Sequence, residues 1–366
     1  MIRTPANHAV PNPFGCAARI RVLVFVCLSA VACAPAGAEE KPQWRRALEA
    51  ANELSSECFG GSNDADCEAM IRHYDAALAA PDASDAIRHD LFAYRLNAVA
   101  VHGGHLVDAG DTKRALSVLY AGYTEMREHF EGGKHAHTVI ENLRLQGHLL
   151  RALVAADDLE NAATVVDLPR QVMPYYYGTL DEYRDNENEK ELALIAEGVV
   201  RSEELETRYG DALIARANAL GADPRAKVAR ADAIVAYRNA LQWLQRGNAE
   251  GWAMPFADTN AIRFAKLNNT LGDALLASGD RKGAIDAHNL AFAAARCKGL
   301  DDGTLRAADR AAAARPCRQA VAGYMAASGE TQRLASDAAE TMYRQQMELY
   351  NTDIGQLLRV APKQAD

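Results

Sequence analysis

One set of residue spacings occurs twice in this chain, and it constrains the fold more than any other feature. The segments are "GGHLVDAGDTKRALSVL" at residues 103–119 and "LGDALLASGDRKGAIDAH" at residues 271–288. Each contains a glycine, a leucine, a Gly-Asp pair and an alanine at identical intervals. A spacing written twice predicts a chain built from repeated structural units. The shared positions are Gly103, Leu106, Gly110, Asp111 and Ala115 in the first segment and Gly272, Leu275, Gly279, Asp280 and Ala284 in the second.

Each segment is typical of a helix, a tight turn and a second helix. The first glycine lies inside an amphipathic helix, where glycine costs about 1 kcal/mol relative to alanine, so the close approach of another helix is expected there. The second glycine can adopt the left-handed conformation that ends a helix, and the aspartate after it can cap the next helix. The alanine lets the two helices lie close together. We therefore expect a helical hairpin at both places.

The composition agrees with an all-α fold. Apolar residues make up 49% of the 366 residues and aromatic residues only 7%. Alanine is frequent in the second half, proline is sparse, and the alternating pattern of strands is almost absent. After the first forty residues, no apolar stretch is long enough for a transmembrane helix.

Residues 1–38 differ from the rest of the chain and predict a secretory signal peptide. Three arginines are their only charged side chains, and the apolar run "VLVFVCLSAVACA", about 13 residues, is too short to span a bilayer. The small residues at 36–38 provide a signal-peptidase site, so we expect cleavage before Glu39. The mature chain is then exported, with the periplasm as the predicted compartment and secretion as an alternative.

Cys33 supports a different processing. It follows small residues in "AVAC", which is similar to a bacterial lipoprotein site, although Ala30 stands where such sites usually have leucine. In this alternative the protein is a lipid-anchored scaffold of the cell envelope.

The charge balance disfavours nucleic acid as a partner. Loss of the signal peptide removes three of the 40 basic residues and none of the 49 acidic ones, which leaves a formal charge of −12. Attraction to phosphates needs a basic surface, and this chain is acidic.

Four of the seven cysteines lie outside the signal peptide, at Cys58, Cys67, Cys297 and Cys317. An even number of cysteines in an oxidising compartment predicts disulfides. Three connectivities are open, and the local pairs Cys58–Cys67 and Cys297–Cys317 are favoured because each closes one short segment. A metal site is the weaker alternative, because neither spacing resembles Cys-x-x-Cys.

The repeated positions resemble the tetratricopeptide repeat, a helix pair of 34 residues. The best unit spans residues 264–297, although Asn268 and His288 stand where the family prefers large apolar side chains. The resemblance implies a right-handed superhelix of stacked pairs, because one pair cannot bury its apolar face alone. The matching residues are Leu271, Gly272, Leu275, Gly279, Ala284 and Ala291.

Other segments match in part and predict about six helix pairs over residues 39–366. Ala233, Tyr237 and Ala240 fit second-helix positions, but the first-helix positions at Gly210 and Leu213 lie further upstream than the repeat allows, so we expect a lengthened central pair. Residues 173–191 break the series and predict an insertion loop that runs into the start of an acidic helix, and capping helices are expected at about 315–350. Weaker copies contain Ala69, Ala76 and Pro81; Leu150, Leu153, Asp157, Asp158 and Ala162; and Met325, Gly329 and Leu334.

The resemblance also implies a concave surface of first-helix residues that binds a protein or peptide partner. These side chains could hydrogen-bond a ligand backbone or pair with a terminal carboxylate. The plainer alternative is that they are solvated helix faces. The lysine and asparagine pattern by which the family clamps a terminal carboxylate is not reproduced, so that recognition is not predicted. The predicted binding residues are Asn97, Asp108, Arg144, Arg151, Lys266, Asn269 and Asp273.

Histidines cluster between residues 102 and 148 and raise another class of function, a helical enzyme or metal-binding protein. His102 and His105 lie three residues apart on a helix, and His135 and His137 follow, so zinc or nickel could be bound. His102 stands where the repeat has a packed leucine, so a partly buried, hydrogen-bonded histidine is the simpler interpretation. No metal and no cofactor is therefore predicted.

The remaining motifs point to binding rather than to chemistry. The chain contains no Gly-x-Ser-x-Gly, His-Glu-x-x-His, phosphate-loop or dinucleotide fingerprint, so no catalytic residue is predicted. Tyr175, Tyr176 and Tyr177 are a candidate aromatic patch for a partner or carbohydrate, with packing onto the rest of the chain as the alternative. The sequence predicts an exported adaptor that binds a protein or peptide partner in the assembly or regulation of the envelope.

Overall fold

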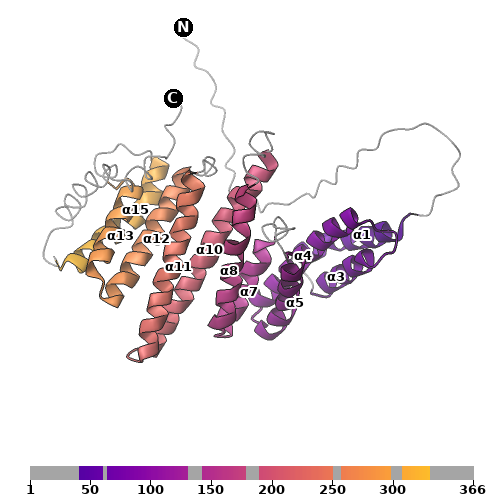
Figure 1. The fold of residues 1–366 in the computed structure, drawn as a ribbon, viewed down its shortest axis with the longest axis horizontal. Helices are drawn as coiled ribbons and strands as arrows, with labels where there is room; N and C mark the ends of the chain where they lie inside the picture. The colour runs from indigo at the N-terminus through magenta and orange to yellow at the C-terminus, as the bar shows by residue number, and fades with distance from the viewer. Residues whose placement is uncertain are drawn as a thin grey trace, which may run out of the picture. The chain divides into compact units, whose positions relative to one another are not determined.

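A computed structural model describes residues 41–60, 64–130, 142–178, 189–249, 257–297 and 307–329, and every regular element in these ranges is an α-helix (Figure 1). The predicted all-α class is confirmed for this part of the chain. None of its helices combines the length and apolar character needed to cross a bilayer. The predicted signal peptide, Cys33, His135 and His137 lie outside the described residues. The helices are α1 (Gln43–Glu53), α2 (Ser55–Phe59), α3 (Asp64–Leu78), α4 (Asp85–Asp108), α5 (Thr112–Phe130), α7 (Leu143–Ala155), α8 (Leu159–Gly178), α10 (Glu189–Leu220), α11 (Pro224–Ala249), α12 (Ala257–Ser278), α13 (Arg281–Ala294) and α15 (Ala307–Ser328).

Each helix packs against its neighbours along the chain. The contacts pair α1 with α3, α4 with α5, α7 with α8, α10 with α11, and α12 with α13. First helices of successive pairs also touch, since α4 contacts α7, α7 contacts α10, and α12 contacts α15. Each pair thus covers apolar surface that a single hairpin would leave in water.

The turns of three pairs share one hydrogen-bonding pattern, which confirms the predicted hairpins. Each turn residue before the capping aspartate has a positive φ: 79° at Gly110, 58° at Asp157 and 92° at Gly279. The backbone N–H of each aspartate donates at 2.9 Å to the carbonyl five residues earlier: Asp111 to Leu106, Asp158 to Leu153 and Asp280 to Leu275. The aspartate side chains then accept from the next helix at 2.9 to 3.2 Å. This is the Schellman end of one helix followed by the N-cap of the next.

The glycines inside the helices are sites of close helix approach, as predicted. A Cβ on Gly272 would lie 2.6 Å from Nε2 of His288, and a Cβ on Gly103 would overlap the side chain of Leu119. Leu119 and His288 follow their glycines at the same sequence offset, so the two hairpins use one packing contact. In the lengthened pair α10–α11, Gly210 lies against the ring of Tyr237 in the same manner.

Two predicted boundaries differ from the helix ends in the structure, although α10 does begin inside the segment predicted to run into an acidic helix. The predicted loop at 173–191 is partly helix, because α8 continues to Gly178 and α10 begins at Glu189. Tyrosine has an ordinary helix propensity, so the tyrosine run does not interrupt α8. Tyr175, Tyr176 and Tyr177 belong to its last turns, and their side chains lie outside the described residues. At the other end, α15 begins at Ala307 rather than near 315, and residues 330–350 are not described.

Both local cysteine pairs lie at disulfide distance. Cys58 and Cys67 join α2 to α3 with sulfurs 2.17 Å apart, and Cys297 and Cys317 join the end of α13 to α15 with sulfurs 2.00 Å apart. All four side chains are buried. The favoured pairing is confirmed, and each bond fixes a helix to its neighbour.

Reduction of the Cys297–Cys317 bond is expected to lower the free energy of unfolding by about 2–4 kcal/mol, because the bond closes a loop of 20 residues in the unfolded chain. The Cys58–Cys67 bond closes a loop of 9 residues, so its loss should cost less. Urea unfolding of the double alanine variant of each pair, with and without reductant, measures the two contributions separately. Equal stability of oxidised and reduced wild-type protein would contradict the prediction.

Candidate functional site

The predicted binding residues lie on three first helices, and most are exposed. Asn97 and Asp108 lie on α4, Arg144 and Arg151 on the adjacent α7, and Lys266, Asn269 and Asp273 on α12. Arg151 is half-buried, and all the others except Asn269 are exposed. Two of the seven meet directly, since Nη2 of Arg151 donates to Asp108 Oδ1 at 2.6 Å. This hydrogen bond from the guanidinium holds the pKa of Asp108 below its ordinary value.

Asn269 is a correction to the predicted surface, because it is 2% exposed. Its amide nitrogen donates to the carbonyl of Pro316 at 2.8 Å, and its oxygen lies 3.2 Å from Nδ1 of His288. Helix α15 packs over this part of α12, and no residue of α12 indicates that contact in the sequence. Asn269 therefore joins three helices and is not available to a partner.

A small cleft separates α7 from α10 and contains one of the predicted residues. We call it the arginine cleft; its volume is about 130 Å³. The α7 wall presents four positions spaced as i, i+1, i+4 and i+5, and the α10 wall presents four spaced as i, i+3, i+4 and i+7, so one stripe of each helix faces the cleft. The lining residues are Leu143, Arg144, Gly147 and His148 from α7 and Arg201, Glu204, Leu205 and Arg208 from α10.

The arginine cleft carries unbalanced positive charge. Arg201 is paired with Glu197 at 2.5 Å, and Glu204 is engaged by Arg263 at 3.3 Å. In the described part of the chain, no carboxylate lies within ion-pair distance of Arg144 or Arg208. Both side chains are exposed. In a chain whose formal charge is −9, this cleft is a local site of positive potential.

The pKa of His148 is affected by these arginines. Burial, with the charges of Arg151, Arg144 and Arg208, lowers the pKa of His148 to about 4, and the charge of Asp108 acts in the opposite direction. The imidazole packs over Gly104 of α4, where a Cβ would lie 2.8 Å from its Cε1. His148 is therefore neutral at pH 7 and offers the cleft a hydrogen-bonding group rather than a charge.

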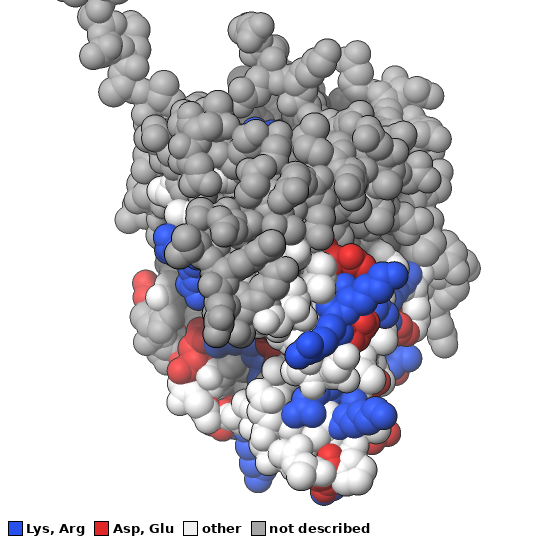
Figure 2. All heavy atoms as spheres, turned by 90° about the vertical axis from the view of Figure 1, so that its left-hand side faces the viewer, with Lys and Arg blue, Asp and Glu red and all other residues white. Residues whose placement is uncertain are grey.

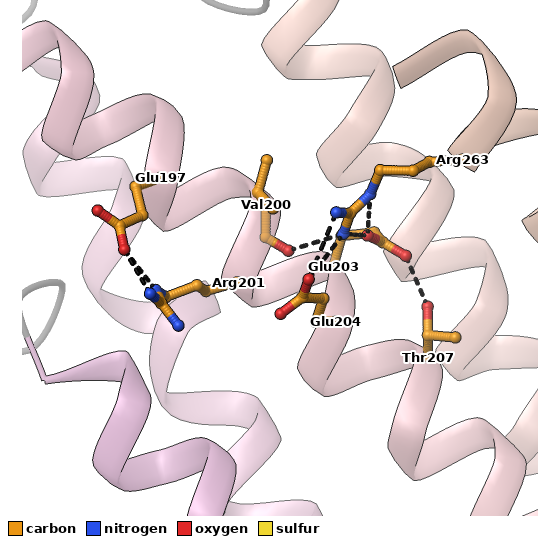
Figure 3. A network of polar contacts seen from close by, with 7 residues as sticks. All are labelled: Glu197, Val200, Arg201, Glu203, Glu204, Thr207 and Arg263. Carbon is orange, nitrogen blue, oxygen red and sulfur yellow. Dashed lines mark hydrogen bonds and ion pairs between the residues drawn. The ribbon is translucent and has the colours of Figure 1, made fainter. Parts of the chain in front are cut away.

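An ion-pair network fixes α10 against α12 beside the cleft (Figure 3). Arg263 of α12 donates through Nε to Glu203 at 3.1 Å and through its terminal nitrogens to Glu204 and to the carbonyl of Val200. Glu203 also accepts from the hydroxyl of Thr207 at 2.8 Å. Glu204 lies four residues before Arg208 on α10, but it pairs with Arg263 of α12 and not with Arg208.

Charge is mixed on the face of the molecule seen in Figure 2. On the face where α13 and α15 lie, Lys and Arg side chains form separate patches with Asp and Glu beside them (Figure 2). The described part of that face carries both signs of charge, so it provides no second site comparable with the arginine cleft.

The sequence identified Arg144 but missed Arg201 and Arg208. Their signal is the helical spacing of Arg201, Glu204 and Arg208, which is visible in the sequence. It could not be assigned to a binding face, because α10 belongs to the irregular pair in which the repeat does not set the register.

The histidine cluster does not come together as a metal site within the described residues. His102 is 1% exposed, and neither of its ring nitrogens has a hydrogen-bond partner there. Burial lowers its pKa, so it is a neutral core residue, but it lacks the predicted hydrogen bond. Nδ1 of His105 lies 3.9 Å from Sγ of Cys67, a disulfide sulfur. The described ranges contain no group of three or more His, Cys, Asp and Glu placed to hold a metal.

Comparisons with known proteins add no relative. No family model matches the chain, and no curated protein or solved structure is significantly similar to it. The likeness to tetratricopeptide repeats therefore depends on the residues and hairpins described above.

Proposed function

We propose that this protein is an exported helical adaptor that binds an acidic segment of a partner protein in the arginine cleft. One observation carries the proposal: Arg144 and Arg208 converge on a cleft between two helices and have no carboxylate partner in the described part of the chain. Isolated positive charges at a concave site favour an anionic ligand, and a charge-assisted hydrogen bond to a carboxylate contributes about 1.5–3 kcal/mol.

The stacked helix pairs support an adaptor role. The packed hairpins hold the two walls of the cleft at a fixed spacing, so little conformational entropy is lost when a partner binds. The polar side chains of Asn97 and Asp108 on α4 extend the same first-helix surface beyond the cleft. A superhelix formed by the stacked pairs would make that surface concave, as in the repeat family that the sequence resembles.

Export fits the cysteine chemistry. Two local disulfides persist in an oxidising compartment and are rare in the cytosol. Together with the predicted signal peptide, they favour an envelope partner over a cytosolic one.

Charge reversal in the cleft is expected to abolish capture of the partner. Crosslinking and pull-down from the native envelope should recover a partner with the wild-type protein, and Arg144→Glu or Arg208→Glu should reduce recovery at least tenfold because each replaces attraction to an acidic segment by repulsion. Recovery should also fall with added salt.

Arg225→Glu is the matched control, because it makes the same charge change at an arginine outside the cleft, in an exposed pair with Asp223. Circular dichroism establishes that all three variants are folded. Undiminished recovery with both cleft variants would show that the arginine cleft is not the binding site.

A further inference from the structure

A second, larger cavity shares no lining residue with the arginine cleft, and none of its lining residues belongs to α7. Its volume is about 490 Å³, within the range of about 300–1,000 Å³ typical of ligand sites. Side chains of α5, α8, α10 and α11 line it. The second helices of three pairs, α5, α8 and α11, thus form three of its walls. The first helix of the third pair, α10, contributes Tyr209.

Two opposite charges on different walls of this cavity have no ionic partner among the described residues. Arg127 on α5 lies with its guanidinium carbon 6.0 Å from the ring centroid of Tyr123, and no carboxylate of the described residues pairs with it. Asp232 on α11 likewise has no cationic partner among the described residues. Burial raises the pKa of Tyr209, and the negative charge of Asp232 raises it further. Both side chains are exposed. Within the described ranges, one wall therefore offers an unpaired cation and another an unpaired anion.

The charges between these walls are already satisfied. Arg170 of α8 pairs with the buried carboxylate of Glu206 at 2.5 Å and with Asp167 at 3.2 Å. Gln171 donates to the other oxygen of Asp167 at 2.6 Å. A ligand would therefore find its ionic partners at Arg127 and Asp232, and the α8 wall would act as a polar support.

The cavity also exposes apolar surface. Val235 of α11 is 53% exposed and lies one turn of helix from Asp232. The rings of Tyr123 and Tyr209 and the side chain of Leu168 line the same space. Water contact with Val235 is unfavourable, so a ligand that covers it gains from apolar burial.

We propose that this cavity binds a zwitterionic ligand of the amino-acid or short-peptide class, with its carboxylate on Arg127, its ammonium group on Asp232 and its apolar side chain over Val235. A ligand with only one charge would satisfy one wall and leave the other charge unpaired. A guanidinium provides the forked donors that suit a carboxylate, and an aspartate accepts from an ammonium group. The site is independent of the proposed adaptor function, because it shares no residue with the arginine cleft.

Isothermal titration of the full-length mature protein with the dipeptide alanyl-leucine tests the proposal. We expect saturable binding that weakens about tenfold or more for Arg127→Gln and for Asp232→Asn. The N-acetylated dipeptide should lose affinity by a similar factor, because it lacks the ammonium group, and the C-terminal amide should do so because it lacks the carboxylate.

Arg208→Gln serves as the control, since it removes a cation from the arginine cleft and should leave dipeptide binding unchanged. Conversely, Arg127→Gln should leave partner capture unchanged, so failure of either proposal is distinguishable from failure of the other. Both substituted side chains of the cavity are exposed, so the variants are expected to fold. Absence of saturable binding, equal affinity for the blocked dipeptides, or unchanged affinity in both cavity variants would overturn the proposal.

Discussion

Replacing Arg263 with methionine is expected to lower the free energy of unfolding by about 3–5 kcal/mol. The guanidinium pairs with Glu203, whose side chain is 7% exposed, and methionine keeps much of the apolar stem but removes the charge. The Glu203 carboxylate would remain buried with only the hydroxyl of Thr207 as a described hydrogen-bond donor (Figure 3). An unpaired buried charge costs more than the pair contributes, so the loss should be large. Urea unfolding at pH 7 measures it.

Arg201→Met is the matched control on α10. Its pair with Glu197 is an i,i+4 surface contact with side chains 39% and 55% exposed, for which about 0.3–0.5 kcal/mol is expected. Adding Glu203→Gln to Arg263→Met should recover part of the loss, since an amide needs no counter-charge. Losses of equal size in the two single variants would contradict the assigned role of burial.

The hairpins were predictable because their determinants are local. A left-handed residue followed by an N-capping aspartate specifies the turn within a few positions, and the alanine and glycine of Gly103–Ala115 encode the helix contact directly. The diacidic turn at Asp157-Asp158 could be recognised for the same reason, since aspartate tolerates the left-handed region better than most residues. Helix ends without such a signal were misplaced, as at the tyrosine run of α8.

The candidate site was predictable only in part, because it depends on two helices from different pairs. Arg144 could be located because the turn after α7 sets the register of that helix. Arg208 could not, since α10 is longer than the repeat and no turn signal anchors its stripe. Asn269 was misassigned for a different reason. Whether a polar side chain on a helix faces water depends on the helix that packs over it, here α15, and the sequence of α12 does not indicate that contact.

Acidification is expected to destabilise the fold, with His288 as a main cause. The carbonyl of Pro316 can only accept, so the amide nitrogen of Asn269 faces it and the amide oxygen faces Nδ1 of His288, which therefore carries the proton. Nε2 is then the site of further protonation, and it lies buried 3.6 Å from Asp273 Oδ1. Burial lowers the pKa of His288 from 6.5 to about 4.

The sign follows from proton binding in the two states. Below pH 6.5 the unfolded chain binds a proton at this histidine that the folded chain does not take up until about pH 4, so the stability contribution is complete above pH 6.5 and is lost as the pH falls toward 4. A pKa lowered by this amount corresponds to about 3 kcal/mol, and His148, whose pKa is also lowered to about 4, should add a loss in the same direction.

Urea unfolding of the wild type and of His288→Gln, at about pH 7 and about pH 4.5, isolates the contribution. The variant should be less stable at neutral pH, because the ring fills the space between Gly272 and Gly323, yet it should lose about 2 kcal/mol less than the wild type on acidification. His148→Gln should show a similar reduction, and the two reductions should add because the residues lie on helices of different pairs. An unchanged pH dependence in His288→Gln would mean that this imidazole takes up its proton at the same pH in the folded and unfolded chains, which would contradict the role assigned to its burial.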